Sequence, residues 1–270
     1  MPHDRRVIVH ADLAALADAV ATRFVTTVVD LLASRDTVHV ALTGGSVGIG
    51  VLRSLASLDD RDAIDWGRVH VWWGDERWVS RDHADRNARQ AREALLDHLS
   101  IPETNVHEFP AADDGIDLES AAARYYDELV RAGEGDLPRF AITFLGVGPD
   151  GHVASLFPER EGPRITEATV IAVHDSPKPP AERLSLSLPL LNLSERVWMV
   201  LAGADKASAL GLALAGASTA DVPVAGVMGT ERTIFFVDEA ASSEVPESLI
   251  TQPEYWTGAM DQPDWSPSAD

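Results

Sequence analysis

The stretch "VHVALTGGSVGIGVLRSL", residues 38–55, joins a short apolar run, two adjacent glycines and a second apolar segment. Residues 38–42 have the composition of a buried strand, and the spacing of apolar residues from 48 to 58 predicts a helix. Glycine lets backbone N–H groups approach a ligand without obstruction by a Cβ atom. This succession of strand, glycine turn and helix predicts an α/β fold with a turn suited to an oxyanion.

The same alternation of strand-like and helix-like segments continues through most of the chain. Further strands are expected at 68–73, 139–145, 169–175, 183–188, 196–203 and 233–238, and further helices at 85–99, 118–133 and 204–216. Strands that are continuous apolar runs separated by helices favour a parallel sheet covered on both faces. We therefore predict an α/β fold with a mostly parallel, Rossmann-like open sheet, helices on both faces and a few additional strands.

The domain organisation predicted from the sequence is simple. No internal repeat or low-complexity linker divides the chain, so residues 1–241 are expected to form a single α/β domain. Residues 242–270 contain several prolines and acidic residues and are expected to form a poorly ordered acidic tail.

Composition excludes several classes of function. The 270 residues include no cysteine, which rules out disulfides, thiolate nucleophiles and Cys-ligated metal sites. The net charge of −21 repels nucleic acid, and no apolar window approaches the length of a membrane span. We expect a cytoplasmic monomer with neither a nucleic-acid nor a membrane partner. A phosphorylated ligand would need cations concentrated locally, which draws attention to the only two lysines, Lys178 and Lys206.

Ligands of open α/β sheets bind beyond the carboxyl ends of the strands, so the loops after the strands are examined first. The first loop contains Thr43, Gly44, Gly45 and Ser46. Its two hydroxyls, its backbone N–H groups and the N-terminus of the following helix could together bind a phosphate. It is not a Walker A loop, because no Gly-Lys-Ser/Thr follows. The alternative is a glycine turn required only for tight helix packing.

The second loop lies in "WWGDERWV", residues 72–79, where Asp75, Glu76 and Arg77 follow an aromatic strand. Such a cluster is either a solvated loop with a local ion pair or a site at which an acid and an arginine contact polar groups of a substrate. Spacing alone favours the solvated loop.

The third loop lies in "FLGVGPDGHVASLFP", residues 144–158, where Gly146, Gly148 and Gly151 match G-x-G-x-x-G. A dinucleotide fingerprint must lead into a long helix. Only six residues separate Gly151 from the next proline, so this reading fails. What remains is a turn that carries His152 two residues after Asp150. Histidine exchanges a proton near neutral pH, and a carboxylate could orient its tautomer. From chemistry alone, a structural and a catalytic histidine remain equally open.

Three further cations lie near the ends of strands. Arg183 and Lys206 could each be a surface charge, but their positions also make them candidates for a phosphate clamp. Lys178 lies in a proline-rich turn and is expected to be solvated or on a mobile loop over the site. The sequence has no H-x-x-x-H pair or acid cluster of the usual spacing, so no catalytic metal is predicted.

Taken together, these motifs resemble the 6-phosphogluconolactonase family, within the wider glucosamine-6-phosphate isomerase and deaminase superfamily. The matching stretches are "LTGGS" (42–46), "WWGDERWV" (72–79), "FLGVGPDGHVASLFP" (144–158), "ERLSLSLPLLN" (182–192) and "LAGADKASAL" (201–210). They occur in the family's order and span about residues 8 to 240.

The resemblance implies a metal-independent hydrolase that uses no cofactor. Its substrate would be a small phosphorylated sugar lactone, 6-phospho-D-glucono-1,5-lactone, hydrolysed to 6-phospho-D-gluconate in the second step of the oxidative pentose phosphate pathway. His152 would act as the general base, and Asp75, Arg77 and Asp150 would surround the reacting end. The glycine loop, Arg183 and Lys206 would hold the 6-phosphate.

Three other functions compete with this one. A glucosamine-6-phosphate deaminase is disfavoured, because the loop of that relative continues to Asn-Glu-Pro, whereas residues 155–158 here read Ser-Leu-Phe-Pro. A non-catalytic sugar-phosphate sensor would need an attached DNA-binding segment, and no basic helix-turn-helix pattern is present. A dinucleotide-dependent oxidoreductase would have to bind NAD.

Overall fold

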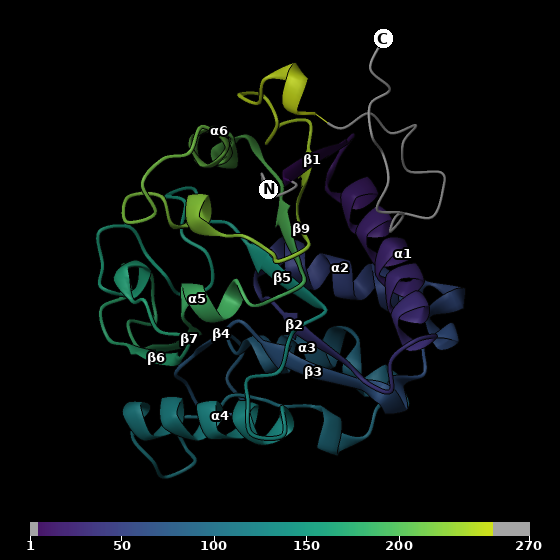
Figure 1. Cartoon of the computed structure of the whole chain (residues 1–270), viewed down its shortest axis with the longest axis vertical. Coiled ribbons are helices and arrows are strands. Elements are labelled where there is room, and N and C mark those ends of the chain that lie inside the picture. The colour runs from purple at the N-terminus through teal and green to yellow at the C-terminus, as the bar shows by residue number, and fades with distance from the viewer. Residues whose placement is uncertain (1–4, 251–270) are drawn as a thin grey trace.

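Six strands form one parallel sheet in the computed structural model, which describes residues 5–250 (Figure 1). The order across the sheet is β1-β9-β8-β5-β2-β3, and every neighbouring pair is parallel. The strands are β1 (Arg5–His10), β2 (Val38–Leu42), β3 (Val69–Trp73), β5 (Ile142–Gly146), β8 (Arg196–Leu201) and β9 (Arg232–Asp238). The predicted α/β fold with a mostly parallel open sheet is confirmed.

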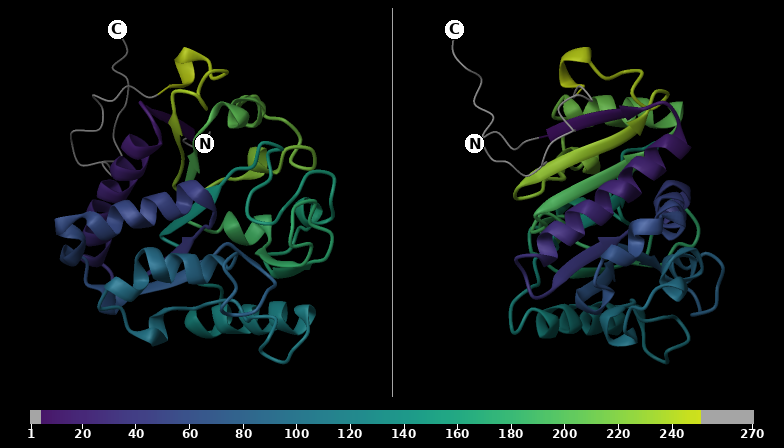
Figure 2. Two further views of the ribbon diagram at one scale, coloured as in Figure 1. Left: turned by 180° about the vertical axis from the view of Figure 1, so that it is seen from behind. Right: turned by 90° about the vertical axis from the view of Figure 1, so that its right-hand side faces the viewer.

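Helices cover both faces of this sheet (Figure 2). Helices α1 (Leu13–Leu32) and α2 (Gly45–Ser57) pack together on one face, where α3 (Asn87–Ala94) contacts α2. There Phe24 of α1 lies 5.7 Å from Phe144 of β5, measured between ring centroids. On the opposite face, Tyr125 of α4 (Leu118–Ala132) makes an edge contact with Trp72 of β3. Alternate residues of each strand therefore enter two separate apolar layers, which explains the continuous apolar runs.

The additional strands form a small antiparallel sheet in the order β4-β7-β6. These strands are β4 (Asp75–Arg77), β6 (Val170–Val173) and β7 (Arg183–Leu186), and α4 packs against this sheet. Gly74 joins it to the large sheet: its N–H donates to the carbonyl oxygen of Leu42 at 3.0 Å, and its own carbonyl accepts from the N–H of Leu186 at 2.9 Å. The polar segment after β3 is thus a strand, although its sequence favoured a solvated loop.

A crevice lies at the carboxyl ends of β2 and β5, two inner strands of the large sheet. The chain passes from β2 through α2 to β3 on one side. After β5, which lies on the other side of β2, the next strand of this sheet is β8, further away on that same side. Chain connections that leave in opposite directions open a crevice at the carboxyl ends of the two strands. The N–H of Gly146, at the end of β5, donates to Oγ1 of Thr43, just after β2, at 3.2 Å. The first and third glycine loops are therefore in contact.

Element boundaries differ from the prediction mainly at helix ends. The helix expected at 85–99 ends at Ala94, because Leu95 leaves the helical region with φ −147° and a short 3₁₀ turn follows. The helix expected at 204–216 begins with a 3₁₀ turn, and its α-helical part is α6 (Ala207–Leu214). A four-residue helix, α5 (Leu188–Leu191), starts within two residues of β7, where the strand was expected to extend to residue 188.

The expected C-terminal tail lies only partly within the described residues. Within it, Glu247–Leu249 form a 3₁₀ turn and Ile250 bridges to Val7 of β1, whereas residues 251–270 lie outside the described range. The domain boundary at residue 241 stays a prediction. Among residues 5–250, no helix combines the length and the apolar character needed to cross a membrane.

Candidate active site

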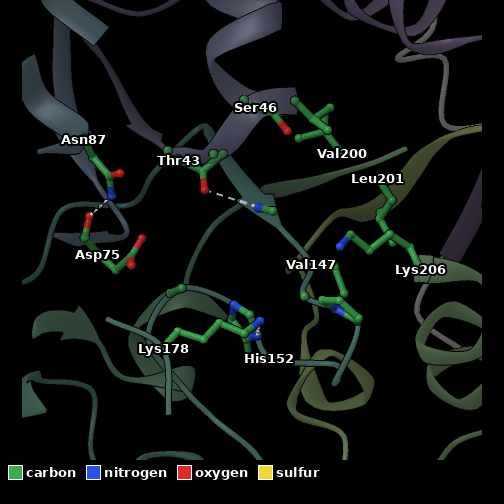
Figure 3. A pocket seen from close by; sticks show the side chains of 18 of the residues that line it. Thr43, Ser46, Asp75, Asn87, Val147, His152, Lys178, Val200, Leu201 and Lys206 are labelled. Atoms are coloured by element: carbon green, nitrogen blue, oxygen red, sulfur yellow. Dashed lines mark hydrogen bonds between the residues drawn. The ribbon is translucent and has the colours of Figure 1, made fainter. Parts of the chain in front are cut away.

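A cavity of about 330 Å³ opens at the carboxyl ends of the central strands, which is a typical size for a small-molecule site (Figure 3). It is bordered by the loops that follow β2, β3, β5 and β8 and by residues of the small sheet. The predicted site residues that line it are Thr43, Gly44, Gly45, Ser46, Asp75, Arg77, Gly146, Gly148, His152, Arg183 and Lys206. The other two, Asp150 and Gly151, immediately precede His152 in the same loop.

The first loop presents the N-terminus of α2 to this cavity. The helix begins at Gly45, and its N-cap residue, Gly44, makes no side-chain cap. Gly45 has φ +78°, a conformation that favours glycine. The N–H groups of the first turn are therefore not capped by a side chain, and the helix dipole adds partial positive charge there. With the hydroxyls of Thr43 and Ser46 beside it, this end of the cavity is suited to an anion.

The third loop supplies a histidine and carboxylate pair. Nδ1 of His152 lies 2.5 Å from Oδ1 of Asp150, and the imidazole packs against Phe157 with 4.7 Å between ring centroids. A carboxylate accepts, so Nδ1–H donates to Asp150 and Nε2 keeps its lone pair. Burial raises the pKa of Asp150. The hydrogen bond from His152 and the charges of His152 and Lys178 together lower it by more, so the pKa lies well below its ordinary value.

Two glycines make room for this pair. A Cβ atom on Gly148 would lie 2.0 Å from the His152 ring and 2.4 Å from Oδ1 of Asp150. Gly151 has φ +80°, and a Cβ there would meet Val222 at 2.8 Å. The glycines at these two positions are therefore needed to accommodate the His152–Asp150 pair and its turn. This explains why the G-x-G-x-x-G spacing occurs here with no helix after it.

Asp75 is buried and points into the cavity from β4. Its Oδ2 accepts from the hydroxyl of Ser155 at 2.8 Å, and Ser155 is itself buried in the third loop. One carboxylate oxygen is thus fixed by the protein, which leaves Oδ1 to meet a ligand. The side chain of Ser155 links the second and third loops across a sequence separation of 80 residues.

Glu76, on the opposite side of β4, is buried and anchors the start of α3. Its carboxylate accepts from the backbone N–H groups of Arg77 at 2.8 Å, Asn87 at 2.7 Å and Ala88 at 2.8 Å. Burial raises the pKa of Glu76 to about 7, although Arg86 and these three N–H groups oppose the rise. The carboxyl group therefore has a structural role rather than a place in the cavity.

Arg77 borders the cavity beside Asn87. Its Nη1 donates to Oδ1 of Asn87 and, at 2.9 Å, to the carbonyl oxygen of Asp85. Arg183 is buried, and its guanidinium lies 5.6 Å above the ring centroid of Phe157. Nε and Nη2 of Arg183 donate to the carbonyl oxygens of residues 178–180 at 3.0 to 3.2 Å. Arg183 thus holds the 178–180 loop as well as lining the cavity.

The two lysines approach the cavity from different sides (Figure 3). Nζ of Lys206 donates to Asp205 at 2.7 Å, and its side chain lies on the side remote from Asp75. Nζ of Lys178 lies 3.2 Å from Nδ1 of His152 and 3.5 Å from Oδ1 of Asp150. An ammonium and an Nδ1–H group are both donors, so they share the carboxylate of Asp150. Lys178 belongs to the histidine end of the site.

Sequence reasoning missed Asn87 and Ser155 and assigned no role to Lys178. Asn87 and Ser155 act through partners that are distant along the chain. Ser155 lies within the stretch 144–158, but nothing in that pattern indicates its contact with Asp75. Lys178 drew attention only as one of two lysines in an acidic chain, and its contacts with Asp150 and His152 depend on the fold. No group of three or more His, Cys, Asp or Glu residues suited to a metal ion occurs within residues 5–250.

The fold and this cavity define an α/β protein with a pocket that is suited to an anion at one end and carries a histidine and carboxylate pair at the other. The chain belongs to the glucosamine-6-phosphate isomerase/6-phosphogluconolactonase family, whose model matches residues 11–236. It is 47% identical to a 6-phosphogluconolactonase from Streptomyces coelicolor over 90% of this chain and 96% of the relative. It is 41% identical to one from Mycobacterium tuberculosis over 86% of this chain and 94% of the relative.

Solved structures agree with this assignment. A 6-phosphogluconolactonase from Thermotoga maritima superimposes with a TM-score of 0.77 at 30% identity, covering 87% of this chain and all of that one. A monomeric glucosamine-6-phosphate deaminase shares the fold, with a TM-score of 0.73 at 20% identity, covering 88% of this chain and 99% of that one.

Replacement of Gly148 by alanine should separate His152 from Asp150, because the new methyl group would overlap both side chains. Nitrogen NMR of the imidazole should then lose the signature of an Nδ1–H bound to a carboxylate. The control is Gly50→Ala in α2, where nothing outside the neighbouring backbone of the helix lies within 4 Å of the added Cβ. That variant should keep the signature and gain up to about 1 kcal/mol of stability. An unchanged His152 spectrum in Gly148→Ala would contradict the steric argument.

Glu76→Gln should weaken the dependence of stability on pH. The carboxyl group has a pKa of about 7 in the folded chain against an ordinary value of 4.5, so the folded chain binds the extra proton between these values. Stability should therefore fall as pH rises from about 5 to 7, by up to about 1.4 kcal/mol per pH unit. Urea midpoints at several pH values measure this slope. The variant should show a flatter slope, while exposed Glu161→Gln keeps that of the wild type; equal slopes would refute the account of Glu76.

Proposed function

We propose that this protein hydrolyses 6-phospho-D-glucono-1,5-lactone to 6-phospho-D-gluconate without a cofactor. The observation that carries the proposal is that His152, which is paired with Asp150, and the uncapped N-terminus of α2 border one cavity. The names of the relatives in Streptomyces and Mycobacterium support the same reaction. One end of the cavity would bind the phosphate, and the other would move protons at the lactone carbonyl.

The chemical step needs a base for water and an acid for the leaving oxygen. Nε2 of His152 takes a proton from water as the water oxygen attacks C1 of the lactone. Asp150 accepts from Nδ1–H, so it fixes the tautomer and stabilises the imidazolium that forms. The imidazolium then returns its proton to the ring oxygen as the C1–O5 bond breaks. The products are a hydroxyl group at C5 and a carboxylic acid, which ionises in water.

Charge on the former carbonyl oxygen grows as the tetrahedral intermediate forms. Arg77 lines the cavity and can donate to this oxygen from Nε or Nη2, because its Nη1 is used by Asp85 and Asn87. Donors already aimed at a developing oxyanion stabilise the transition state without reorganisation. The free oxygen of Asp75 would accept from a hydroxyl group of the sugar and fix the orientation of the ring.

The phosphate would lie against the first turn of α2. Backbone N–H groups of the glycine loop and the hydroxyl groups of Thr43 and Ser46 supply donors there, and Lys206 supplies a charge from β8's loop. Anchoring the phosphate would hold the lactone carbonyl near His152. Part of the binding free energy is then used to orient the substrate for attack. Location in the cytoplasm and action as a monomer stay predictions.

Replacement of His152 by alanine should remove the general base. With lactone made freshly by enzymatic oxidation of glucose 6-phosphate, acid release above the spontaneous rate should fall about 10²–10⁴-fold in kcat/KM. Exposed His98→Ala is the matched control and should keep the wild-type rate. Equal rates for His152→Ala and the wild type would remove the assigned base. A wild type no faster than the background would end the proposed function.

Lys206→Ala should weaken phosphate binding more than it slows chemistry. We expect KM to rise about tenfold with kcat changed less than about threefold, because uniform binding to substrate and transition state is lost. Lys206→Arg keeps the charge and should stay close to the wild type. Arg183 is a less clean test, because its loss would also release the 178–180 loop. An unchanged KM in Lys206→Ala would exclude this lysine from the phosphate end.

A further inference from the structure

The side-chain amide of Asn87 forms hydrogen bonds to the second loop through both its nitrogen and its oxygen. It is the first residue of α3, is 1% exposed and lines the cavity. Its Nδ2 donates to the carbonyl oxygen of Asp75 at 2.9 Å, and its Oδ1 accepts from Nη1 of Arg77. A buried amide with both groups engaged has one defined orientation. Its contacts with Arg77 and with the backbone of Asp75 therefore form a single unit.

The same side chain touches the first loop. A Cβ atom on Gly44 would lie 1.8 Å from Oδ1 of Asn87. Gly44 has an ordinary φ of −81°, so glycine is needed there for space rather than for backbone conformation. Asn87 consequently lies between the glycine loop and Arg77. Figure 3 shows the hydrogen bond from its amide to the backbone of Asp75.

The backbone of Asn87 is held independently of its side chain. Glu76 accepts from the N–H groups of Asn87 and Ala88 and thereby fixes the first turn of α3. Removal of the amide would leave these two hydrogen bonds in place. The role of the side chain can therefore be tested separately from the anchoring of the helix.

Arg77 depends on this contact for its orientation. Its long side chain has about 2 kcal/mol of rotamer entropy to lose when fixed. Within residues 5–250, its side chain donates only to Asn87 and to the carbonyl of Asp85, both through Nη1. The remaining donors, Nε and Nη2, have no partner in that range and border the cavity. An arginine tethered by one nitrogen presents the other two in a fixed direction.

We propose that Asn87 is a positioning residue that holds Arg77 in the orientation needed to stabilise the oxyanion. The inference rests on the proposed lactone hydrolysis and adds a residue to it. Asn87 acts through Arg77, so its loss should slow the chemical step without weakening the anchoring of the phosphate.

The test is a double-mutant cycle on freshly prepared lactone. Arg77→Ala should lower kcat about 10²–10³-fold, as expected for the loss of an oxyanion donor. Asn87→Ala should lower kcat by up to about 10²-fold through misplacement of Arg77, with KM within about threefold of the wild type. The double variant should lie within about threefold of Arg77→Ala, because Asn87 has nothing left to position.

Controls separate this role from damage to the fold. Asn105 is also buried, and its Nδ2 donates to the carbonyl oxygens of Gly67 and Val69, away from the cavity. Asn105→Ala should therefore leave kcat unchanged. If Asn87→Ala does not fold, Asn87→Ser takes its place in the cycle, because serine also lacks the amide that contacts Arg77 and keeps a polar group at this position.

Two results would overturn the proposal for Asn87. One is a kcat for the Asn87 variant within about threefold of the wild type, and the other is a double variant reduced by the full product of the two single effects. Either result, obtained with an active wild type, rejects the positioning role alone. A wild type without activity would instead reject the lactonase function.

Discussion

The hydrogen bond between the N–H of Gly146 and Oγ1 of Thr43 is the contact on which the site depends. It joins the ends of β2 and β5, where the chain connections of the parallel sheet leave in opposite directions. The glycine loop that could bind a phosphate and the loop that carries His152 therefore face one cavity. A sheet that placed these strands further apart would leave both loops intact but separate their chemistry.

The distribution of charge fits a small anionic ligand in an otherwise acidic protein. The net charge is −21, yet both lysines of the chain and two arginines, Arg77 and Arg183, line a single cavity. Each of these cations is also held by the protein: the lysines lie beside carboxylates, and the arginines donate to carbonyl or amide oxygens. Held cations have less freedom to lose when a ligand binds.

Sequence reasoning predicted the parts of the site that are local in the chain. A strand, a glycine turn and a helix identified the first loop, and the absence of a helix after Gly151 separated the histidine loop from a dinucleotide fingerprint. It could not predict β4, because Asp75, Glu76 and Arg77 have no strand-like composition and their pairing with β7 requires a partner about 108 residues away. The roles of Asn87 and Ser155 depend on similar tertiary contacts, which no local pattern encodes.

The two backbone hydrogen bonds of Gly74 limit how the walls of the cavity can move. Because its N–H donates to β2 and its carbonyl accepts from the residue that ends β7, this one residue ties the large sheet to the small one. The wall of the cavity that carries Asp75 therefore cannot swing as a hinge without breaking bonds in two sheets. The 178–180 segment is held instead by side-chain contacts, from Arg183, from Ser176 and between Lys178 and Asp150, so it can adjust to an incoming ligand without breaking the pairing of strands.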